Sequence, residues 1–406
     1  MTLPVLINGG GMVGLALALA LAEAGIGVHL LEGQAAPLPP GHWQALRAQA
    51  DFDTRVSAIT LATERLLRRL GVWEPLLALR TSPYRDMRVW DADGTGHIHF
   101  AAEEVQCEAL GHIVENRLLC SVLAASLATH PLARCDFGRG LHSAERSAAG
   151  DWNVVCDDGT VFKARLLLGA DGASSVVREL AGVPTRRWSY QQRALVCTLR
   201  STRPHAGTAF QRFLPSGPLA LLPLCLPGAE TQCYSSLVWS CDTALADELL
   251  GLPEPAFLQQ LTHASEGVLG EIESATARSA LTLQQQHAVD YVQPGLALIG
   301  DAAHTIHPLA GQGVNLGFAD VESLVAVLVV AERRGEALAS LPVLTRYQRQ
   351  RKGPNLGMML AMEAFKRSFG SDALTVRWLR NAGLRLAAGS LPLKRALIRQ
   401  AMGLSG

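Results

Sequence analysis

The first 32 residues alternate between short apolar runs and glycine-rich turns. Residues 4–8 are apolar and are followed by three glycines, residues 12–24 are rich in Ala and Leu, and residues 28–31 are again apolar and end at Glu32. Ala and Leu favour helix, and the glycines that follow residue 24 favour its end. The pattern predicts a strand, a tight turn, a helix and a second strand, which together form a βαβ unit.

The same kind of pattern continues along the chain. Residues 157–159, Asp-Asp-Gly, are a turn signal, so 152–168 is expected to form a hairpin. Residues 35–41 are Pro-rich and are expected to form a loop. Helices are expected at 60–70, 117–130, 242–266 and 315–334 and over most of the remaining chain, and further strands at 84–100, 193–241 and 296–299. Helices and strands are therefore mixed, which indicates an α/β protein.

Composition narrows the class of protein. A chain of 406 residues suggests two or three domains, and 49% hydrophobic with 18% charged residues can form large cores. The formal net charge of zero gives no basic domain for nucleic acid. No Lys or Arg precedes Arg47 and no uninterrupted apolar run is long enough to span a bilayer, so we expect a cytoplasmic protein, soluble or peripheral to the inner membrane.

The eight cysteines are scattered, and none forms a C-x-x-C pair. This spacing favours reduced thiols over a disulfide framework, and it predicts no metal site.

A glycine motif lies between the first predicted strand and helix. Gly9, Gly11 and Gly14, with Met12 and Val13 between the last two, satisfy G-x-G-x-x-G. The first glycine permits a tight turn, the second lets a pyrophosphate approach the backbone, and the third lets helix and strand pack closely. The N–H groups at the helix start favour phosphate. The alternative is a glycine-rich turn that binds no ligand.

Glu32 ends the second strand, 18 residues after Gly14. Its carboxylate can accept hydrogen bonds from a ribose diol and would repel a 2′-phosphate. FAD and NAD therefore both fit this half of the site, and NADP does not. Asn8, directly before the glycines, is unusual at a position that is more often small and apolar, and we expect it to hydrogen-bond locally.

Three further motifs bear on the choice of cofactor. Residues 169–178 read GADGASSVVR after an apolar run, residues 298–304 read LIGDAAH, and residues 307–317 read HPLAGQGVNLG, followed by Asp320. With these motifs the chain resembles flavoprotein monooxygenases of the para-hydroxybenzoate-hydroxylase type, and within them the ubiquinone-biosynthesis hydroxylases. Residues 53–59, 111–116 and 397–403 are most similar to the 2-polyprenylphenol 5-hydroxylase branch.

This resemblance implies an α/β architecture in which a Rossmann-like, three-layer FAD-binding domain is interleaved with a β-sheet substrate domain and followed by a helical C-terminal segment. The expected FAD-binding domain comprises residues 1–83, 105–185 and 280–340. The expected substrate domain comprises 84–104 and 186–279, and the helical region comprises 341–406.

The resemblance also implies residue roles. Asp301 would bind the ribityl chain, and Arg55 would approach the flavin. Asp171, beside Arg178, would support the pyrophosphate region, although a salt-bridged strand–helix turn is an equal alternative. The other expected cofactor contacts are the looser matches Asn116 and Arg117, the shaping residue Pro308, and the backbone of Gly311, Gly313, Val314 and Asn315 beside the pyrimidine edge of the ring.

The implied reaction is hydroxylation of a polyprenylated phenol, with FAD reduced by NAD(P)H and oxygen transferred through a flavin hydroperoxide. His304 or His307 is a candidate general base, and the alternative is that both are structural histidines. The predicted sheet and the loop beside the flavin are expected to form an apolar wall for the substrate, with the side chains of Phe213, Leu221, Pro223 and Pro308. For each of these residues, a place in the ordinary apolar core is an equal alternative.

Residues 375–406 contain six basic side chains and no acid, interleaved with apolar residues. Such a segment suits an anionic membrane surface, a partner in a ubiquinone-biosynthesis complex, or a capping helix on the FAD-binding domain. Three alternatives to the 5-hydroxylase remain open: a sister enzyme acting at another ring carbon, a hydroxylase of a small soluble phenol, and a non-catalytic flavin-bound subunit. Oligomeric state and prenyl length also remain open.

Overall fold

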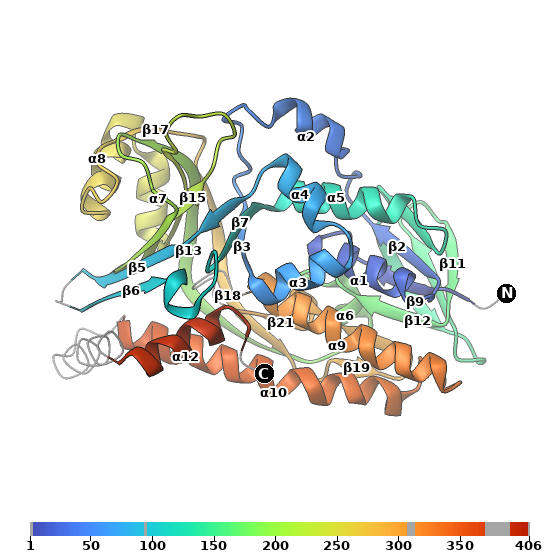
Figure 1. Ribbon diagram of the computed structural model, residues 1–406. Coiled ribbons are helices and arrows are strands. Elements are labelled where there is room, and N and C mark those ends of the chain that lie inside the picture. Colours follow the sequence, from blue (N-terminus) through green and yellow to red (C-terminus); the bar gives the residue numbers. More distant parts are fainter. Residues whose placement is uncertain (1–2, 93–95, 307–312, 370–389, 405–406) are drawn as a thin grey trace.

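Two large sheets stand side by side and share a layer of helices beneath them (Figure 1). The computed structural model describes residues 3–92, 96–306, 313–369 and 390–404. The expected contacts of His307, Pro308 and Gly311 lie outside the described residues, as do Arg377, Arg380 and Arg385 of the basic segment.

The first sheet has six strands in the order β19-β20-β12-β1-β2-β8, and all its pairs are parallel except β19 with β20. Its central strand β1 is completely apolar up to Asn8 and buried on both faces, as expected for a covered parallel strand. The strands are β1 Val5–Asn8, β2 Val28–Glu32, β8 Ala133–Phe137, β12 Leu166–Gly169, β19 Val292–Gln293 and β20 Leu296–Leu298.

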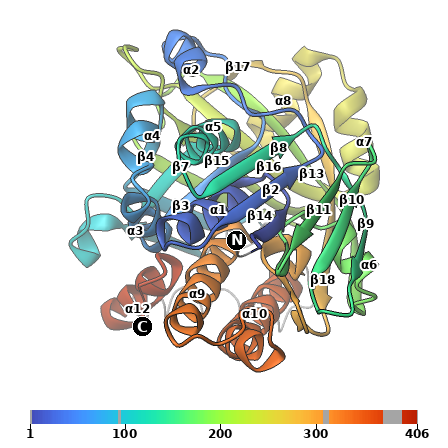
Figure 2. The same cartoon turned by 90° about the vertical axis from the view of Figure 1, so that its right-hand side faces the viewer.

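Helices cover one face of this sheet and a small antiparallel sheet covers the other (Figure 2). The helices are α1 Met12–Glu23, α5 Asn116–Ala128 and α9 Gly313–Arg333, and the small sheet is β9 Leu141–Arg146, β10 Trp152–Cys156 and β11 Val161–Ala164. The imidazole of His29 in β2 lies edge-on to Phe162 of β11, with ring centroids 4.4 Å apart. These three layers match the expected FAD-binding architecture. The hairpin predicted at 152–168 forms as β10 and β11 only as far as Ala164, and residues 166–168 belong to β12 of the six-stranded sheet.

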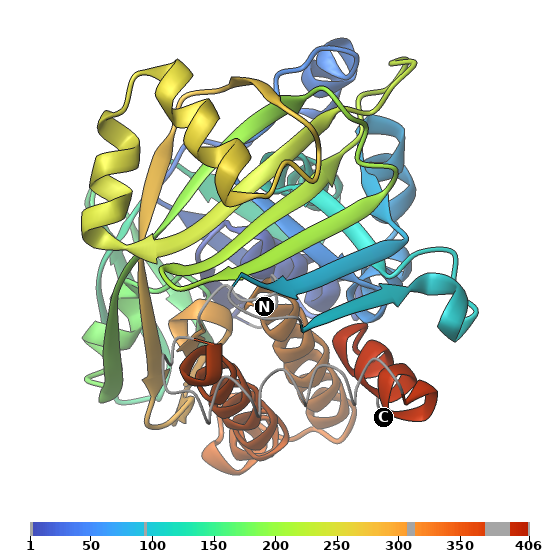
Figure 3. The ribbon, with the colours of Figure 1, turned by 90° about the vertical axis from the view of Figure 1, so that its left-hand side faces the viewer.

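The second sheet has the order β21-β18-β13-β16-β15-β14-β5-β6, and a ninth strand, β17, pairs with β13. Helices α7 Thr243–Gly251 and α8 Glu254–Ala264 cover its outer face (Figure 3). The strands are β5 Asp86–Asp91, β6 His97–Ala101, β13 Thr185–Ser201, β14 Thr208–Leu214, β15 Gly217–Leu224, β16 Tyr234–Asp242, β17 Ile272–Ala275, β18 Ser279–Ala288 and β21 His304–Thr305.

Strand β18 differs from its expected assignment. Residues from 280 onward were expected in the FAD-binding domain, but β18 pairs with β13 from Thr185↔Ala288 to Val196↔Ser279. It therefore belongs to the second sheet, and the chain returns to the first sheet only at β19. The wider division into domains stays a prediction.

A third, smaller sheet lies between the two large ones. It has the order β3-β7-β4 and carries helices on its flank. Its elements are β3 Val56–Thr60, β7 Gly111–Glu115 and β4 Ser82–Tyr84, and the helices are α2 Pro40–Leu46, α3 Leu61–Arg69 and α4 Trp73–Leu79. The expected loop at 35–41 therefore ends two residues earlier than predicted, because Pro40 begins α2.

The remaining elements are the helices η1 Ala102–Val105, α6 Val176–Leu180, η2 Gly300–Ala302, α10 Leu341–Phe369 and α12 Leu391–Ala401. Helix α12 buries Ile398 and Met402 against Ala102 and Leu110, and Lys394 pairs with Glu104. The described part of the basic segment thus packs as a capping helix. Among the described helices, only α9 is long and apolar enough to cross a membrane, and the face that includes Phe318 lies in the core instead.

Candidate functional site

The glycine turn between β1 and α1 is built for close approach. A side chain at Gly14 would place its Cβ 1.9 Å from the carbonyl oxygen of Gly9, so only glycine lets helix and turn pack here. Gly9 has φ +116°, which disfavours any other residue. A Cβ on Gly11, in contrast, would meet nothing within 4 Å. The turn is therefore closed toward the protein and open where a phosphate would lie.

Glu32 supports the turn from the neighbouring strand. Its Oε2 accepts a hydrogen bond from the N–H of Gly10 at 2.5 Å, and its Oε1 accepts one from the N–H of Gln34 at 2.7 Å. The carboxylate is thus fixed at the carboxyl end of β2, and its side chain remains partly exposed. The first turn of α1 contains no acidic residue, so its N–H groups remain suited to an anion.

Asn8 connects two motifs that are far apart in the sequence. Its Nδ2 donates to Asp171 Oδ2 at 2.9 Å, and Ser175 Oγ donates to Asp171 Oδ1 at 2.5 Å. The expectation that Asn8 hydrogen-bonds locally is therefore wrong, since Asp171 lies 163 positions away in the sequence. Arg178 is buried and donates a hydrogen bond to the carbonyl of Ala302 at 2.9 Å. Its guanidinium therefore holds the turn through the backbone, and not through the salt bridge that was the alternative expectation.

The second half of the site meets the first at α1. A Cβ on Gly300 would lie 3.3 Å from Val13 Cγ1, and one on Gly317 would lie 2.7 Å from Val13 Cγ2. The opening glycine turn and the Gly300–Asp301 turn therefore converge on Val13, as a single nucleotide bound along its length requires.

Asp301 follows β20 at the mouth of this junction. The surrounding protein raises the pKa of its carboxyl group, and the nearby charge of His304 and then that of Arg55 oppose the rise. The residue is nevertheless exposed to solvent, and no described residue donates a hydrogen bond to its carboxylate. An exposed carboxylate that receives no hydrogen bond from a described residue, directly after the Gly300 turn, fits a ligand hydroxyl such as those of a ribityl chain.

His304, unlike Asp301, is not accessible to solvent. It is 2% exposed, and its Nε2 lies 2.5 Å from Oδ2 of Asp320, which is fully buried in α9. Arg351 of α10 donates to the other oxygen of Asp320 at 2.7 Å. Although burial raises the pKa of Asp320, His304 and Arg351 hold it below its usual value. A ring enclosed in this way cannot reach a substrate, so we withdraw the general-base role expected for His304.

The first turn of α9 is fixed by the side chain of Asn315. Its Oδ1 accepts hydrogen bonds from the Thr60 N–H at 3.1 Å and the Thr63 hydroxyl at 2.8 Å, and its Nδ2 donates to the Ala58 carbonyl at 2.8 Å. The side chain is therefore occupied by β3 and α3, which leaves the backbone at the start of the helix, with Gly313 and Val314, for the expected ring contact.

Comparison with known proteins identifies the protein family. A model of the FAD-binding domain family matches residues 2–355. The chain belongs to this FAD-binding family. It is 39% identical over 400 residues to the 3-demethoxyubiquinol 3-hydroxylase of Escherichia coli K12, covering 98% of each chain, and 39% identical over 399 residues to the ubiquinone hydroxylase UbiL of Rhodospirillum rubrum, covering 98% of this chain and 89% of that one.

Solved structures share the fold. The p-nitrophenol 4-monooxygenase PnpA of Pseudomonas putida aligns with a TM-score of 0.78 at 18% identity, over 100% of this chain and 98% of that one. The monooxygenase PqsL of Pseudomonas aeruginosa aligns with a TM-score of 0.76 at 21% identity, over 95% and 100%. The resemblance drawn from the motifs, the α/β fold and the assignment as an FAD-dependent monooxygenase are thus confirmed.

In this monooxygenase the loop that carries Arg55 is held in part by two residues that the resemblance singled out for the cofactor. Arg117 donates its N–H to Asp53 Oδ2 at 3.0 Å, and its guanidinium lies 4.5 Å from the ring centre of Trp43. Asn116 accepts a hydrogen bond from the Ser57 hydroxyl at 2.7 Å. Asn116 and Arg117 were expected at the cofactor; they hydrogen-bond with Ser57 and Asp53 in the segment that carries Arg55, and their contact with the cofactor stays a prediction.

The expected substrate wall divides between the two faces of the second sheet. Leu221 packs among the residues beneath α7 and α8, on the outer face, so its side chain cannot line a site between the sheets and its expected role is withdrawn. Pro223 lies two residues after Leu221 in the same strand, so its side chain lies on the same face of the sheet, and it is also buried. Phe213 lies on the opposite face, with Met362 of α10, and remains a candidate.

Leu222 and Leu224 also lie on the inner face. They cluster with Phe52 and Ile113 between the second sheet and the small sheet β3-β7-β4. This cluster was missed because residues 219–224 are apolar at nearly every position.

Proposed function

We propose that this monooxygenase hydroxylates the ring of a polyprenylated phenol in ubiquinone biosynthesis, with NAD(P)H as the reductant of its FAD. The names of two relatives that align over nearly the whole chain support the pathway. The observation that carries the substrate class is the apolar inner face of β15, where the partly exposed side chain of Leu222 lies beside Phe52 of the loop that carries Arg55. An apolar wall of this kind fits an isoprenoid-bearing ring better than a charged or very polar substrate.

The residues of the chain have separate tasks in this proposal. The N–H groups at the start of α1 and the open space at Gly11 receive the pyrophosphate, Glu32 receives the adenosine ribose, and Asp301 receives the ribityl hydroxyls. The start of α9 presents backbone N–H groups to the pyrimidine edge. When bound, FAD supplies the oxygen-activating chemistry, and the protein orients the ring and keeps water out.

The ring carbon remains to be assigned. Residues 53–59, 111–116 and 397–403 favour the 5-hydroxylase of 2-octaprenylphenol. A second candidate follows from the relative at 39% identity, whose name places its hydroxylation at carbon 3 of a demethoxyubiquinol. The same site serves either reaction, because a rotation of the ring within an apolar slot exchanges the carbon that faces the flavin. Contact with a membrane or with a biosynthetic complex is part of the proposal, and the exposed Leu360 of α10 and Leu397 of α12 are consistent with it.

Lipid-extract mass spectrometry of a deletion strain tests the proposal, because the accumulated intermediate identifies the missing step. Accumulation of 2-octaprenylphenol supports hydroxylation at carbon 5, and accumulation of demethoxyubiquinol supports carbon 3. The strain is complemented with the wild type, with Asp301→Ala and with the matched surface control Asp290→Ala, and only Asp301→Ala should fail. Normal quinone in the deletion strain contradicts the proposal.

The same set of strains separates the alternatives. Full complementation by Asp301→Ala in the absence of bound FAD points to a non-catalytic subunit. Purified enzyme that oxidises NAD(P)H in response to a small soluble phenol, but not to a prenylated one, points to a different substrate.

A further inference from the structure

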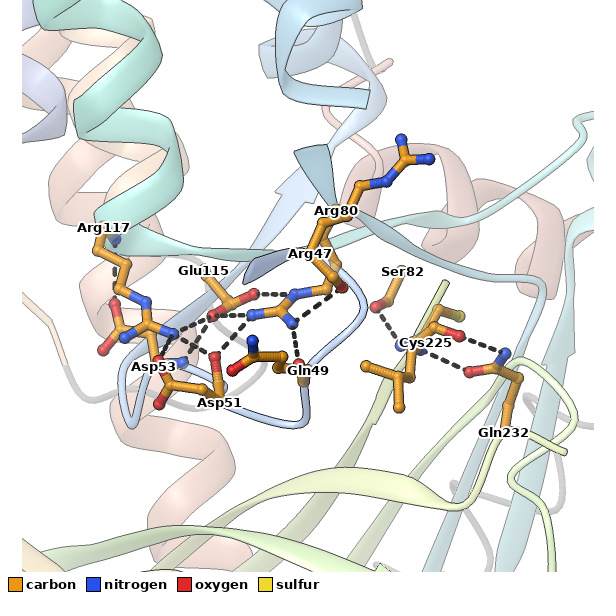
Figure 4. A network of polar contacts seen from close by, with 11 residues as sticks. Arg47, Gln49, Asp51, Asp53, Arg80, Ser82, Glu115, Arg117, Cys225 and Gln232 are labelled. Atoms are coloured by element: carbon orange, nitrogen blue, oxygen red, sulfur yellow. Dashed lines mark hydrogen bonds and ion pairs between the residues drawn. The ribbon is translucent and has the colours of Figure 1, made fainter. Parts of the chain in front are cut away.

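The segment that carries Arg55 has no regular secondary structure of its own. It covers residues 47–55, between the end of α2 and the start of β3. Its N–H groups and carbonyls are therefore not satisfied by a helix or a sheet ladder, and something else must fix its position. Figure 4 shows that side chains from outside the segment do so.

Arg80, directly after α4, makes most of these contacts. Its Nε donates to Glu115 Oε1 at 2.6 Å and its Nη2 donates to Glu115 Oε2 at 3.0 Å. The same guanidinium donates to the carbonyls of Gln49 and Asp51, each at 2.8 Å, and lies 4.2 Å from the ring centre of Phe52. Arg80 is 6% exposed and Glu115 is 3% exposed, so the pair is shielded from water.

Glu115 extends the contact toward Arg55. Its Oε2 accepts a hydrogen bond from the Asp53 N–H at 2.6 Å. The carboxylate of Asp53 then accepts one from the Arg55 N–H at 3.0 Å and one from the Arg117 N–H at 3.0 Å. An unbroken series of hydrogen bonds thus leads from the buried pair to the backbone of Arg55.

The series ends at Arg55. The charge of Arg55 lowers the pKa of Asp301, so the two side chains are near enough to interact electrostatically. On the other side of the pair, Ser82 Oγ accepts a hydrogen bond from the N–H of Cys225 at 2.7 Å, at the end of β15. The short stretch from Arg80 to Ser82 therefore contacts both the loop beside the flavin and the strand that carries Leu222 and Leu224.

We propose that Arg80 and Glu115 are positioning residues, which hold loop 47–55 and with it Arg55 at the flavin and keep this loop in register with the substrate sheet. The proposal rests on the proposed function, since Arg55 is expected to contact the flavin. The fork of the guanidinium reaches a carboxylate and two carbonyls at once, which a lysine cannot do. A buried ion pair is a weak source of stability compared with apolar packing, so its use here favours a geometric role.

The test compares variants of the FAD-loaded enzyme: Arg80→Met, Glu115→Ala, Glu115→Gln and Asp53→Ala. The matched control is Arg278→Met. Arg278 also donates to two backbone carbonyls, of Leu249 and Leu252, at 2.7 Å and lies over a phenylalanine ring, but on the outer face of the second sheet.

Two measurements are made on each variant. The first is the rate of tryptic cleavage after Arg47 and Arg55, which reports the opening of the loop. The second is the fraction of reductant electrons that appear as hydrogen peroxide instead of hydroxylated product. Arg80→Met and Glu115→Ala should raise cleavage by about tenfold or more and increase the peroxide fraction severalfold. Glu115→Gln, which keeps the acceptor oxygen, should give an intermediate result.

Asp53→Ala removes only the last hydrogen bond of the series, so it should accelerate cleavage after Arg55 more than cleavage after Arg47. This variant tests the proposal if Arg80→Met does not fold. Wild-type cleavage and coupling in both Arg80→Met and Glu115→Ala, or the same loosening in Arg278→Met, would overturn the proposal. If wild-type enzyme hydroxylates no prenylated phenol, the proposed function fails, whereas the cleavage rates of the FAD-loaded protein still decide whether the pair holds the loop.

Discussion

Replacing Asp320 by Asn removes one charge from a fully buried carboxylate that holds the Gly300–Asp301 turn. Asp320 is 0% exposed and accepts hydrogen bonds from four groups: His304 Nε2 at 2.5 Å, the Gly300 N–H at 3.0 Å, Arg351 Nε at 2.7 Å and Asn355 Nδ2 at 3.1 Å. The substitution preserves the volume but turns one acceptor into a donor. At least one of these donors then loses its partner, and Arg351 keeps a charge without a counterion.

The expected cost is about 3–5 kcal/mol, the range for breaking a buried ion pair by removing one partner. That is a large share of the ~5–15 kcal/mol by which a typical domain is stable. A second effect is local: the Gly300 N–H loses its acceptor, so the turn that presents Asp301 should loosen and the affinity for FAD should fall. Urea unfolding followed by tryptophan fluorescence measures the first effect, and titration of the apoprotein with FAD measures the second.

Asp290→Asn is the matched control. The Asp290 carboxylate is 56% exposed and lies 3.4 Å from the ammonium group of Lys352, which like Arg351 belongs to α10. Removing the charge of Asp290 should therefore cost no more than about 1 kcal/mol of unfolding free energy. If Asp320→Asn unfolds at the same urea concentration as Asp290→Asn and binds FAD with wild-type affinity, the four hydrogen bonds do not have the importance assigned to them.

Three further predictions concern the glycine turn, the Asn8 link and pH. Gly11→Ala should leave the unfolding free energy of the apoprotein unchanged and weaken FAD binding, because the added Cβ meets only open space. Gly14→Ala should instead destabilise the apoprotein itself. Equal effects of the two substitutions in urea unfolding and in FAD titration would contradict this. Asn8→Ala should cost about 1–3 kcal/mol in urea unfolding by removing a donor from Asp171, and no loss would show that the link is dispensable. Burial lowers the pKa of His287 to about 4, so between about pH 6.5 and 4 the unfolded chain binds a proton that the folded protein does not. The unfolding free energy should therefore fall as pH decreases through this window, by up to about 1.4 kcal/mol per pH unit, and a His287→Gln variant that kept the full slope would refute the assignment.

The elements nearest the cofactor were the most predictable. The βαβ unit of residues 5–32 follows from local rules, since glycine spacing, helix propensity and strand length act within a few residues of one another. The convergence of Gly300 on Val13 followed in turn from the resemblance of the motifs to a known family. Local signals and a shared motif are thus sufficient to predict that these two turns converge.

The faces of the substrate sheet were not predictable. A half-exposed strand alternates between apolar and polar residues, and that alternation identifies the buried face. In β15 both faces are covered, one by α7 and α8 and the other by the small sheet, so the alternation is absent. The expectation for Leu221 failed for this reason, because the register that assigns it to the outer face depends on partners distant in sequence.

The residues that hold the site were also missed. Arg80 lies in no motif, and Glu115 lies within the segment 111–116 that supports the family resemblance, but no local signal indicates that the two side chains meet. The partner of Asn8 lies 163 positions away, and the partners of Asp320 include two residues of α10. A pairing of this kind is a property of the folded topology, so a single sequence contains no local signal for it.

These hidden anchors share a physical cause. A loop that binds a nucleotide through its backbone must leave N–H groups free for the ligand, so it cannot use them in a helix or a sheet ladder. Its position must then be fixed by side chains that enter from behind, and those side chains must be buried and polar to satisfy the remaining backbone groups. Asp171, Asp320 and the Arg80–Glu115 pair each do this for a different loop. Buried polar residues with remote partners are therefore expected around such a slot, and in this chain their location identifies the loops that the cofactor requires to be held.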